Sequence, residues 1–347
     1  MKTYDVRVKD FKPLISPDAL KEELPISEAS AQTVLNGRNV IQDIITRKDA
    51  RLMVITGPCS IHDEQAALEY AHRLIDLQQR VQKSLYLVMR VYFEKPRTTV
   101  GWKGLINDPN LDGSYDVIAG LKKARRLLDQ IAAMGLAAAT ELLDPFIPQY
   151  IAGLVCWAAI GARTTESQTH REMASGLSMP VGFKNGTDGN LDVALNAMIA
   201  AGSPQHFLGI DHKGQASVVR TTGNPYAHIV LRGGRRPNYD SCSIREALDM
   251  LRAKELTEVL VVDCSHSNSR KRFKEQSVAW KDVIQQRIAG NDAIVGLMLE
   301  SNLHEGSQKN TGDPKALAYG ISITDACISW EMTEELILWA AKQMQSR

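Results

Sequence analysis

Four side chains that commonly bind divalent metals lie far apart in this chain, and three of them lie at or near the end of a short apolar run. A thiolate, an imidazole and two carboxylates together form a donor set suited to Mn, Fe, Co or Zn. Taken singly, a buried cysteine is more often inert packing, and a histidine is as often structural as ligating. The fold would therefore have to bring the four donors together: Cys59, His266, Glu300 and Asp325.

A second set of side chains is cationic, and its members fall at or just after the ends of apolar runs. Solvated charges normally lie on the outer faces of helices, so six cations at such positions indicate an anion-binding site. Arginine suits phosphate and carboxylate, whereas lysine offers a compact charge or a movable proton. We therefore expect a polyanionic ligand with two phosphate positions. The set comprises Arg90, Lys95, Arg97, Arg163, Lys184 and Arg232.

The sequence Lys-Pro-Arg-Thr-Thr at 95–99 indicates that one of these phosphate positions is a separate subsite. Pro96 fixes the backbone there, so that Arg97 and the hydroxyl of Thr98 can act as hydrogen-bond donors. The basic run at 269–274 has a different interpretation. We expect it to be the solvated start of a helix, because that is the usual meaning of a charge run.

Eight short apolar runs supply the strands that would position these side chains. Runs of this kind, without strict alternation, are typical of parallel strands that are buried on both faces. Each run ends at or near a charged, thiol or imidazole side chain. The runs cover residues 52–55, 85–89, 136–140, 157–162, 180–183, 228–231, 259–263 and 294–299.

Amphipathic helical patterns lie between these runs, at 64–82, 117–134, 190–200, 244–251 and 277–288. The alternation of strands and helices predicts an α/β fold. Eight such units, with polar groups at the carboxyl ends of the strands, favour a (β/α)8 TIM barrel, whose loops converge on a substrate at that face. A doubly wound open sheet is the alternative, and it would place its site at one switch point.

Composition narrows the possible partners and the compartment. The chain has 347 residues, with 41 Lys and Arg against 40 Asp and Glu, so its net charge of +1 offers no field for nucleic acid or anionic lipid. No signal peptide begins the sequence and no apolar stretch approaches membrane-spanning length, so we expect a soluble, cytoplasmic protein. Five scattered cysteines do not form a disulfide framework, which leaves reduced thiols.

Two segments fall outside the barrel pattern, and we divide the chain accordingly. Residues 1–48 are expected to form an arm and a helix near 30–46, and residues 49–347 the catalytic barrel. Within the barrel, alternating runs at 206–210 and 215–220 flank a turn, which predicts an inserted hairpin at about 205–222. Neither segment helps to close a barrel, so both are free to mediate assembly or regulation.

Several of these segments closely resemble the metal-dependent type I 3-deoxy-D-arabino-heptulosonate 7-phosphate (DAHP) synthases. Each motif is far longer than a chance pattern, and the resemblance spans nearly the whole chain. The motifs are Gly-Pro-Cys-Ser-Ile-His-Asp at 57–63, Met-Arg-Val-Tyr-Phe-Glu-Lys-Pro-Arg-Thr-Thr at 89–99, Ile-Gly-Ala-Arg-Thr-Thr-Glu-Ser at 160–167, Gly-Phe-Lys-Asn-Gly-Thr-Asp-Gly at 182–189 and Leu-Arg-Gly-Gly at 231–234.

The resemblance implies a (β/α)8 barrel that condenses phosphoenolpyruvate with erythrose 4-phosphate, the first step of the shikimate pathway. One divalent metal ion per subunit would be held by the four donors named above, with Asp325 also near the aldose. Arg97 and Thr98 would bind the phosphate of erythrose 4-phosphate. Phosphoenolpyruvate would lie among Arg90, Lys95, Arg163, Lys184 and Arg232.

The implied reaction gives roles to the catalytic residues Lys95, Cys59, His266 and Glu300. The metal acts as a Lewis acid on the aldehyde oxygen while the enol carbon of phosphoenolpyruvate attacks. Lys95 is the candidate general acid. Water then adds at C2 and phosphate leaves by C–O cleavage, with either Glu300 or His266 assisting, and the choice of general base is open.

In the resembling family an N-terminal arm and an inserted hairpin support oligomer contacts and a feedback site for an aromatic amino acid. We expect a homotetramer or homodimer, inhibited by tyrosine or, as the next choice, by phenylalanine. Segments 143–145, 207–210 and 327–332 look most like the tyrosine-sensitive isoform. The alternative is that both segments only bury an interface. The residues implicated are Asp5, Val8, Pro148, Gln149, Leu177, Ser178, Phe207, Gly209 and Val219.

Two other hypotheses were weighed against this assignment. A sister synthase that uses arabinose 5-phosphate would share similar anion sites, but the Lys-Pro-Arg-Thr-Thr segment argues against it. A catalytically silent sugar-phosphate sensor would bind ligand without releasing phosphate. The intact set of metal donors argues against the sensor.

Overall fold

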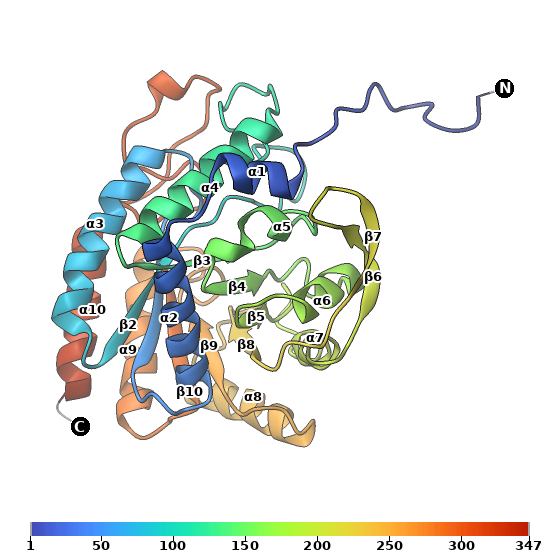
Figure 1. Cartoon of the computed structure of the whole chain (residues 1–347). Coiled ribbons are helices and arrows are strands. Elements are labelled where there is room, and N and C mark those ends of the chain that lie inside the picture. The colour runs from blue at the N-terminus through green and yellow to red at the C-terminus, as the bar shows by residue number, and fades with distance from the viewer. Residues whose placement is uncertain (1, 346–347) are drawn as a thin grey trace.

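A computed structural model describes residues 2–345, and within them eight parallel strands close into a barrel that helices surround (Figure 1). Neighbouring strands pair in the order β1-β10-β9-β8-β5-β4-β3-β2, so the first and last strands of the chain lie side by side. The barrel strands are β1 (Leu52–Gly57), β2 (Leu85–Arg90), β3 (Ala137–Glu141), β4 (Trp157–Ile160), β5 (Val181–Lys184), β8 (Ala227–Leu231), β9 (Leu260–Asp263) and β10 (Ile294–Glu300).

Each predicted apolar run forms one strand, so the prediction of a (β/α)8 barrel is confirmed and that of an open sheet is excluded. The strand ends differ slightly from the prediction. Arg90, Glu141, Lys184 and Glu300 are themselves the last residues of their strands, rather than the first residues after them. The sheet continues to these positions because a charged side chain at a barrel mouth leaves the backbone hydrogen bonds of its strand intact.

Alternate residues of each strand face the barrel interior, because side chains along a strand repeat every two residues. Inner-face residues such as Ile55, Val88 and Val261 pack together in one buried cluster. On the same face, Arg90 follows two residues after Val88, and Asp263 follows two residues after Val261. The pattern that fills the core therefore also delivers charged groups to the carboxyl-terminal mouth.

Helices cover the outside of the barrel, and several begin at an aspartate cap. At the start of α3, Asp63 accepts hydrogen bonds from the backbone N–H groups of Gln65 and Ala66. Among the residues described, no helix combines the length and the apolar character needed to cross a bilayer. The helices are α1 (Pro17–Glu23), α2 (Glu28–Ile45), α3 (Glu64–Val81), α4 (Val117–Ala133), α5 (Pro148–Ile151), α6 (Gln168–Ser175), α7 (Asp192–Gly202), α8 (Ser241–Ala253), α9 (Gln276–Ile288) and α10 (Trp330–Gln345), with the 3-10 turns Ala152–Leu154, Phe273–Glu275 and Pro314–Ala316.

Helix α2 packs against the amino-terminal end of the barrel, which corrects the expectation that all of residues 1–48 are free for assembly. Its residues Ile41 and Ile44 belong to the same buried cluster as the inner-face residue Met53. The approach is close at Gly37, where an added Cβ would lie 2.8 Å from Cys156 Sγ. This helix is therefore part of the core, and its loss would expose the floor of the barrel.

Only the first part of the N-terminal segment projects from the body, as Figure 1 shows. The chain is anchored again around α1, where Tyr150 Oη donates to the carbonyl of Ile15 at 2.8 Å. The backbone N–H of Asp18 donates to the carbonyl of His212 at 2.9 Å. His212 lies in the turn of the predicted hairpin, which is present as the antiparallel strands β6 (His206–Ile210) and β7 (Ala216–Arg220).

Only the end of the basic run at 269–274 begins a helix, whereas the prediction assigned the whole run to a helix start. Arg270 and Lys271 have φ values of 50° and 59°, which lie in the left-handed region and interrupt helical geometry. The N–H of Lys271 donates to the carbonyl of His266 at 2.8 Å. Residues 269–272 are therefore a tight turn after β9, and the run ends in the 3-10 turn Phe273–Glu275, which leads directly into α9 at Gln276.

The buried imidazole of His228 makes the stability of the barrel depend on pH. Trp157 Nε1 donates to His228 Nε2 at 3.1 Å, and His228 Nδ1 lies 3.0 Å from the carbonyl of Tyr226, an arrangement that needs the neutral ring. Burial lowers the pKa of His228 to about 4. The unfolded chain binds this proton near pH 6.5 and the folded chain does not, so stability is complete above that value and is lost as the pH falls.

We predict that this histidine alone removes about 3 kcal/mol of unfolding free energy between pH 6.5 and pH 4. Replacing it, as His228→Gln, should flatten the decline in the urea midpoint over this range. The exposed His72 on α3 provides the matched control, His72→Gln, which should keep the decline of the unaltered chain. Equal slopes for all three chains would show that His228 does not carry the effect.

Candidate active site at the mouth of the barrel

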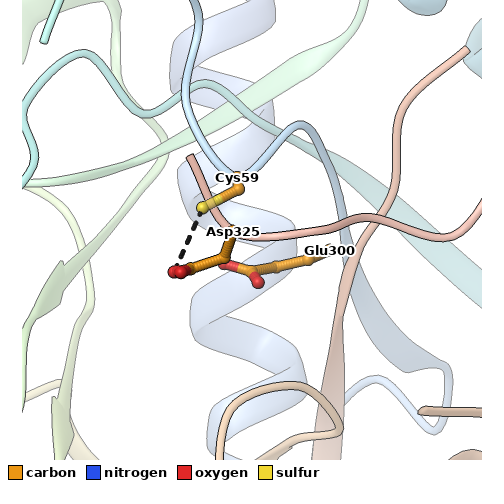
Figure 2. A group of neighbouring side chains, drawn as sticks. All are labelled: Cys59, Glu300 and Asp325. Carbon is orange, nitrogen blue, oxygen red and sulfur yellow. Dashed lines mark hydrogen bonds between the residues drawn. The ribbon is translucent and has the colours of Figure 1, made fainter. Parts of the chain in front are cut away.

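Three of the four predicted metal ligands lie together at the mouth of the barrel (Figure 2). One donor atom from each of Cys59, Glu300 and Asp325 lies within 4.8 Å of the other two. Gly57 of β1 pairs with Glu300 of β10, which brings the beginning and the end of the barrel together. Asp325 comes from the loop that precedes α10.

The fourth predicted ligand, His266, lies beside this group rather than within it. Its Nε2 is 3.8 Å from Glu300 Oε1, and its Nδ1 is 3.0 Å from Asp263 Oδ2. Its φ of 56° is uncommon for a residue other than glycine. Nδ1 also lies 2.7 Å from Ser265 Oγ. With the Nδ1–H directed to Asp263 and Ser265, the lone pair of Nε2 is available on the side of Glu300. The residues present therefore fit a cation that prefers mixed sulfur, nitrogen and oxygen donors.

The ionisation of Cys59 depends on its neighbours. Burial, followed by the nearby carboxylates of Glu300 and Asp325, raises the pKa of the Cys59 thiol to about 11. The thiol donates to Asp325 Oδ2 at 3.6 Å, and Lys95 Nζ lies 3.0 Å from Cys59 Sγ. The sulfur therefore keeps its proton near neutral pH, and a bound cation would have to displace it.

Arg90 holds the backbone turn at Pro58 and Cys59 in place. Its side chain is 1% exposed, and its Nε donates to the carbonyl of Pro58 at 3.0 Å. Its Nη2 donates to the carbonyl of Cys59 at 3.1 Å and to Glu300 Oε1 at 3.0 Å. The guanidinium thus fixes two of the predicted metal ligands relative to each other.

A cavity of about 270 Å³ opens next to the metal-binding group and is rich in cations. Within its wall, Arg163 Nη2 donates to Thr98 Oγ1 at 3.3 Å, which joins the loops after β4 and β2. Such a wall suits an anionic ligand. Arg90 lies below this wall rather than in it. The predicted site residues that line the cavity are Lys95, Arg97, Thr98, Arg163, Lys184, Arg232, His266 and Asp325.

Several other residues line the cavity that were not predicted as site residues. Glu141 ends β3 and is buried, and it packs closely on Gly161, where an added Cβ would lie 2.2 Å from Glu141 Oε1. Glu141 carries the same signal as the assigned residues, because it also follows an apolar run. Ala162 and Thr187 carry no such signal, and only the closure of the barrel places them in the wall.

Asn185 belongs to the motif at 182–189 but was not predicted as a site residue. It is fully buried, and its Nδ2 donates to the carbonyls of Gly186 and Gly233 at 2.8 and 2.9 Å. Its Oδ1 accepts from the backbone N–H of Arg232 at 2.9 Å and from Asn238 Nδ2 at 3.2 Å. The amide therefore ties the end of β5 to the loop that carries Arg232.

The predicted regulatory residues come from several elements of the single chain, and α6 packs against the hairpin strand β6. Phe207 lies opposite Val219 in the hairpin, and an added Cβ on Gly209 would lie 2.8 Å from Val219 Cγ2. The arm that carries Asp5 and Val8 runs away from the barrel, so one chain does not bring these two to the hairpin (Figure 1). The other four lie in α5 or just after α6: Pro148, Gln149, Leu177 and Ser178.

Comparison with known proteins gives a consistent result. The sequence profile of the DAHP synthetase I family matches residues 23–337. The chain is 55% identical over 333 residues to the Tyr-sensitive phospho-2-dehydro-3-deoxyheptonate aldolase of Salmonella typhimurium, covering 96% of this chain and 94% of that protein. It is 52% identical over 344 residues to the Phe-sensitive enzyme of Escherichia coli, covering 99% and 98%. The solved phospho-2-dehydro-3-deoxyheptonate aldolase of Francisella tularensis superposes with a TM-score of 0.95 at 43% identity, covering 98% and 99%.

The buried amide of Asn185 leads to a prediction about ligand affinity. In Asn185→Ala, the backbone N–H of Arg232 and its neighbours lose their partners, and each unsatisfied buried group costs about 1–3 kcal/mol. We expect a lower urea midpoint and roughly tenfold weaker binding of phosphoenolpyruvate, measured by equilibrium dialysis. Asn36→Ala, at an exposed position on α2, should change neither quantity. Unchanged affinity in Asn185→Ala would contradict the role of this amide.

Proposed function

Because the chain belongs to the DAHP synthetase I family, we propose that the mouth of its barrel binds phosphoenolpyruvate and erythrose 4-phosphate side by side. The activity is that of a DAHP synthase, in which these two substrates and water give DAHP and phosphate. The observation that carries the site assignment is the group of Cys59, Glu300 and Asp325 at the edge of a cation-lined cavity. Two polyanions can share one cavity only where positive groups offset their repulsion.

We propose that Cys59, His266, Glu300 and Asp325 hold one divalent ion per subunit. Their sulfur, nitrogen and oxygen donors admit Mn, Fe, Co or Zn. When bound, such an ion supplies a Lewis acid that polarises the aldehyde carbonyl. The hydrogen bonds from Arg90 to Glu300 and to the carbonyl of Cys59 support this assignment, because they hold two of the donors in place without the ion.

Lys95 is the proposed general acid for the aldehyde oxygen. It lines the cavity, and its Nζ lies 3.0 Å from Cys59 Sγ, so it stands between the metal donors and the substrate space. Burial lowers the pKa of Lys95, but the neighbouring Cys59 and Glu300 outweigh burial and raise that pKa above its usual range. The ammonium therefore stays protonated and can donate as the new carbon–carbon bond forms.

The remaining cations are proposed to bind and orient the two substrates. Arg97 and Thr98 hold the phosphate of erythrose 4-phosphate, near Asp325. Orientation of this kind can lower the barrier by roughly 7–11 kcal/mol. Water then adds at C2 and phosphate leaves by C–O cleavage, with Glu300 or His266 assisting the proton transfer. Phosphoenolpyruvate lies among Lys95, Arg163, Lys184 and Arg232, above the buried Arg90.

We further propose feedback inhibition by an aromatic amino acid, with tyrosine first because the Salmonella relative is named Tyr-sensitive. The hairpin residues Phe207, Gly209 and Val219 would form one wall of this site. Asp5 and Val8 are exposed and belong to the arm that projects from the body, so they would join the site from a second subunit. We therefore propose a homodimer or homotetramer in which the arm reaches a neighbouring hairpin.

The metal assignment predicts the behaviour of Cys59→Ala. After chelation, the unaltered chain should lose turnover and regain it when a single divalent metal is returned. The variant should lose turnover by more than roughly a hundredfold with every metal, because one ligand is missing. Its circular dichroism and urea midpoint should stay close to those of the unaltered chain.

Cys242→Ala is the matched control for this experiment, because Cys242 is an exposed cysteine on α8. It should lose and regain activity as the unaltered chain does. Full metal-restored activity in Cys59→Ala would remove that residue from the site and the proposed metal centre with it.

The regulatory proposal predicts that inhibition weakens in the order tyrosine, phenylalanine, tryptophan. Phe207→Ala should raise the concentration of tyrosine needed for half inhibition by roughly tenfold or more, since a buried aromatic contact is lost. Leu208→Ala is the control, because Leu208 is 81% exposed on the opposite face of the same strand. If none of the three amino acids inhibits the unaltered chain, the regulatory proposal is wrong and the hairpin and arm have a structural role only.

A further inference from the structure

Asp263 lies between two groups that the proposed function assigns to different ligands. It ends β9, is 1% exposed, and its Oδ2 is 3.0 Å from His266 Nδ1 and 2.9 Å from Lys184 Nζ. Its other oxygen accepts from the backbone N–H of Ser265 at 3.0 Å and from Ser265 Oγ at 2.6 Å. One carboxylate oxygen is therefore shared by a proposed metal ligand and a proposed phosphoenolpyruvate ligand.

We propose that Asp263 is a positioning residue that couples these two sites, so that metal and phosphoenolpyruvate each strengthen the binding of the other. The inference rests on the proposed roles of His266 and Lys184. It adds a residue that touches neither ligand in the proposed arrangement. It also adds a property, the mutual dependence of two binding events, that neither role implies by itself.

The coupling follows from how one carboxylate oxygen divides its hydrogen bonding. A cation on His266 Nε2 makes the Nδ1–H a stronger donor, which draws Asp263 Oδ2 toward the histidine. The ammonium of Lys184 is then less firmly held and can turn its charge toward an anion in the cavity. In the reverse direction, an anion that takes Lys184 leaves Asp263 to the imidazole and makes it a better ligand. Thermodynamic linkage requires the two effects to be equal in size.

The competition for Asp263 has a large energetic effect because Lys184 and Asp263 are both buried. The side chains of Lys184 and Asp263 are 4% and 1% exposed, so water cannot replace a partner that moves away. A buried charge that loses its partner is strongly unfavourable. Lys184 therefore alternates between Asp263 and an anionic ligand rather than being released to solvent. The same pair keeps the lysine oriented before any ligand arrives.

The test is a set of binding measurements without the aldose, so that no turnover occurs. Mn²⁺ affinity is measured on the metal-free protein from the electron paramagnetic resonance of free Mn²⁺. Phosphoenolpyruvate affinity is measured by equilibrium dialysis with and without saturating Mn²⁺. In Asp263→Asn we expect Mn²⁺ to bind roughly 10–100-fold more weakly, as for other outer partners of a metal-bound histidine. The factor by which Mn²⁺ improves phosphoenolpyruvate binding should fall at least threefold.

A purely structural role makes a different prediction for Asp263→Asn. A collapsed site would weaken phosphoenolpyruvate binding to the metal-free protein in parallel with Mn²⁺ binding, whereas our proposal expects that affinity to be retained, because the amide competes less for Lys184. Ser265→Ala is the companion variant: its hydroxyl contacts Asp263 Oδ1 at 2.6 Å and His266 Nδ1 at 2.7 Å, so the change removes a side-chain partner of both residues but keeps the shared carboxylate oxygen. It should retain the coupling factor. Parallel loss of both affinities in Asp263→Asn, or an unchanged coupling factor, would overturn the proposal.

Lys184→Met tests the same coupling by removing the lysine instead of the aspartate. Its result does not depend on whether Asp263→Asn folds. Without Lys184, Asp263 Oδ2 is left to His266, so Mn²⁺ should bind the metal-free variant at least as tightly as it binds the unaltered chain. Weaker Mn²⁺ binding would overturn the proposal. Cys59→Ala, measured alongside, separates the two hypotheses: unchanged Mn²⁺ binding in that variant contradicts the proposed metal site itself, whichever result Asp263→Asn gives.

Discussion

The pairing of buried charges inside a closed barrel is the constraint on which the rest of this structure depends. A carboxylate or a cation buried alone at the mouth would cost several kcal/mol, so each needs a partner from another strand. Arg90 of β2 meets Glu300 of β10 at 3.0 Å, and Lys184 of β5 meets Asp263 of β9 at 2.9 Å. These pairs fix the charged groups before a ligand arrives, which is the condition for a preorganised site.

The same pairing sets the protonation of the site. Burial alone would raise the pKa of Asp263, yet Lys184 and His266 hold that pKa well below its usual range, so the carboxylate stays charged. The thiol of Cys59 experiences the opposite balance, since burial and its carboxylate neighbours favour the protonated form. The outer cations Arg97 and Arg163 are exposed to the cavity and to solvent, where they remain available to phosphate groups.

The parts of the chain outside the barrel divide into those that complete the core and those that project from it. Helix α2 contributes Ile41 and Ile44 to the inner cluster of the barrel, so its contribution is to stability. The hairpin instead presents Leu208 and Val218 to solvent on one face, and the arm before α1 is also largely exposed. Exposed apolar residues on such peripheral elements are typical of surfaces that meet a partner.

The sequence by itself determined the barrel and most of the site, because buried parallel strands require continuous apolar runs and the mouth residues must follow them. Cys59, Lys184 and Glu300 were predicted in this way, and the resemblance to the family then gave them roles. Only the tertiary structure decided which charges pair. Cys59 and Asp325 are separated by 266 positions, and their contact depends on the pairing of β1 with β10 and on the bridge from Ser301 to Ile328 in the loop before α10, rather than on any local preference. For the same reason the shared oxygen of Asp263, the amide of Asn185 and the packing of α2 could not be derived from the sequence pattern.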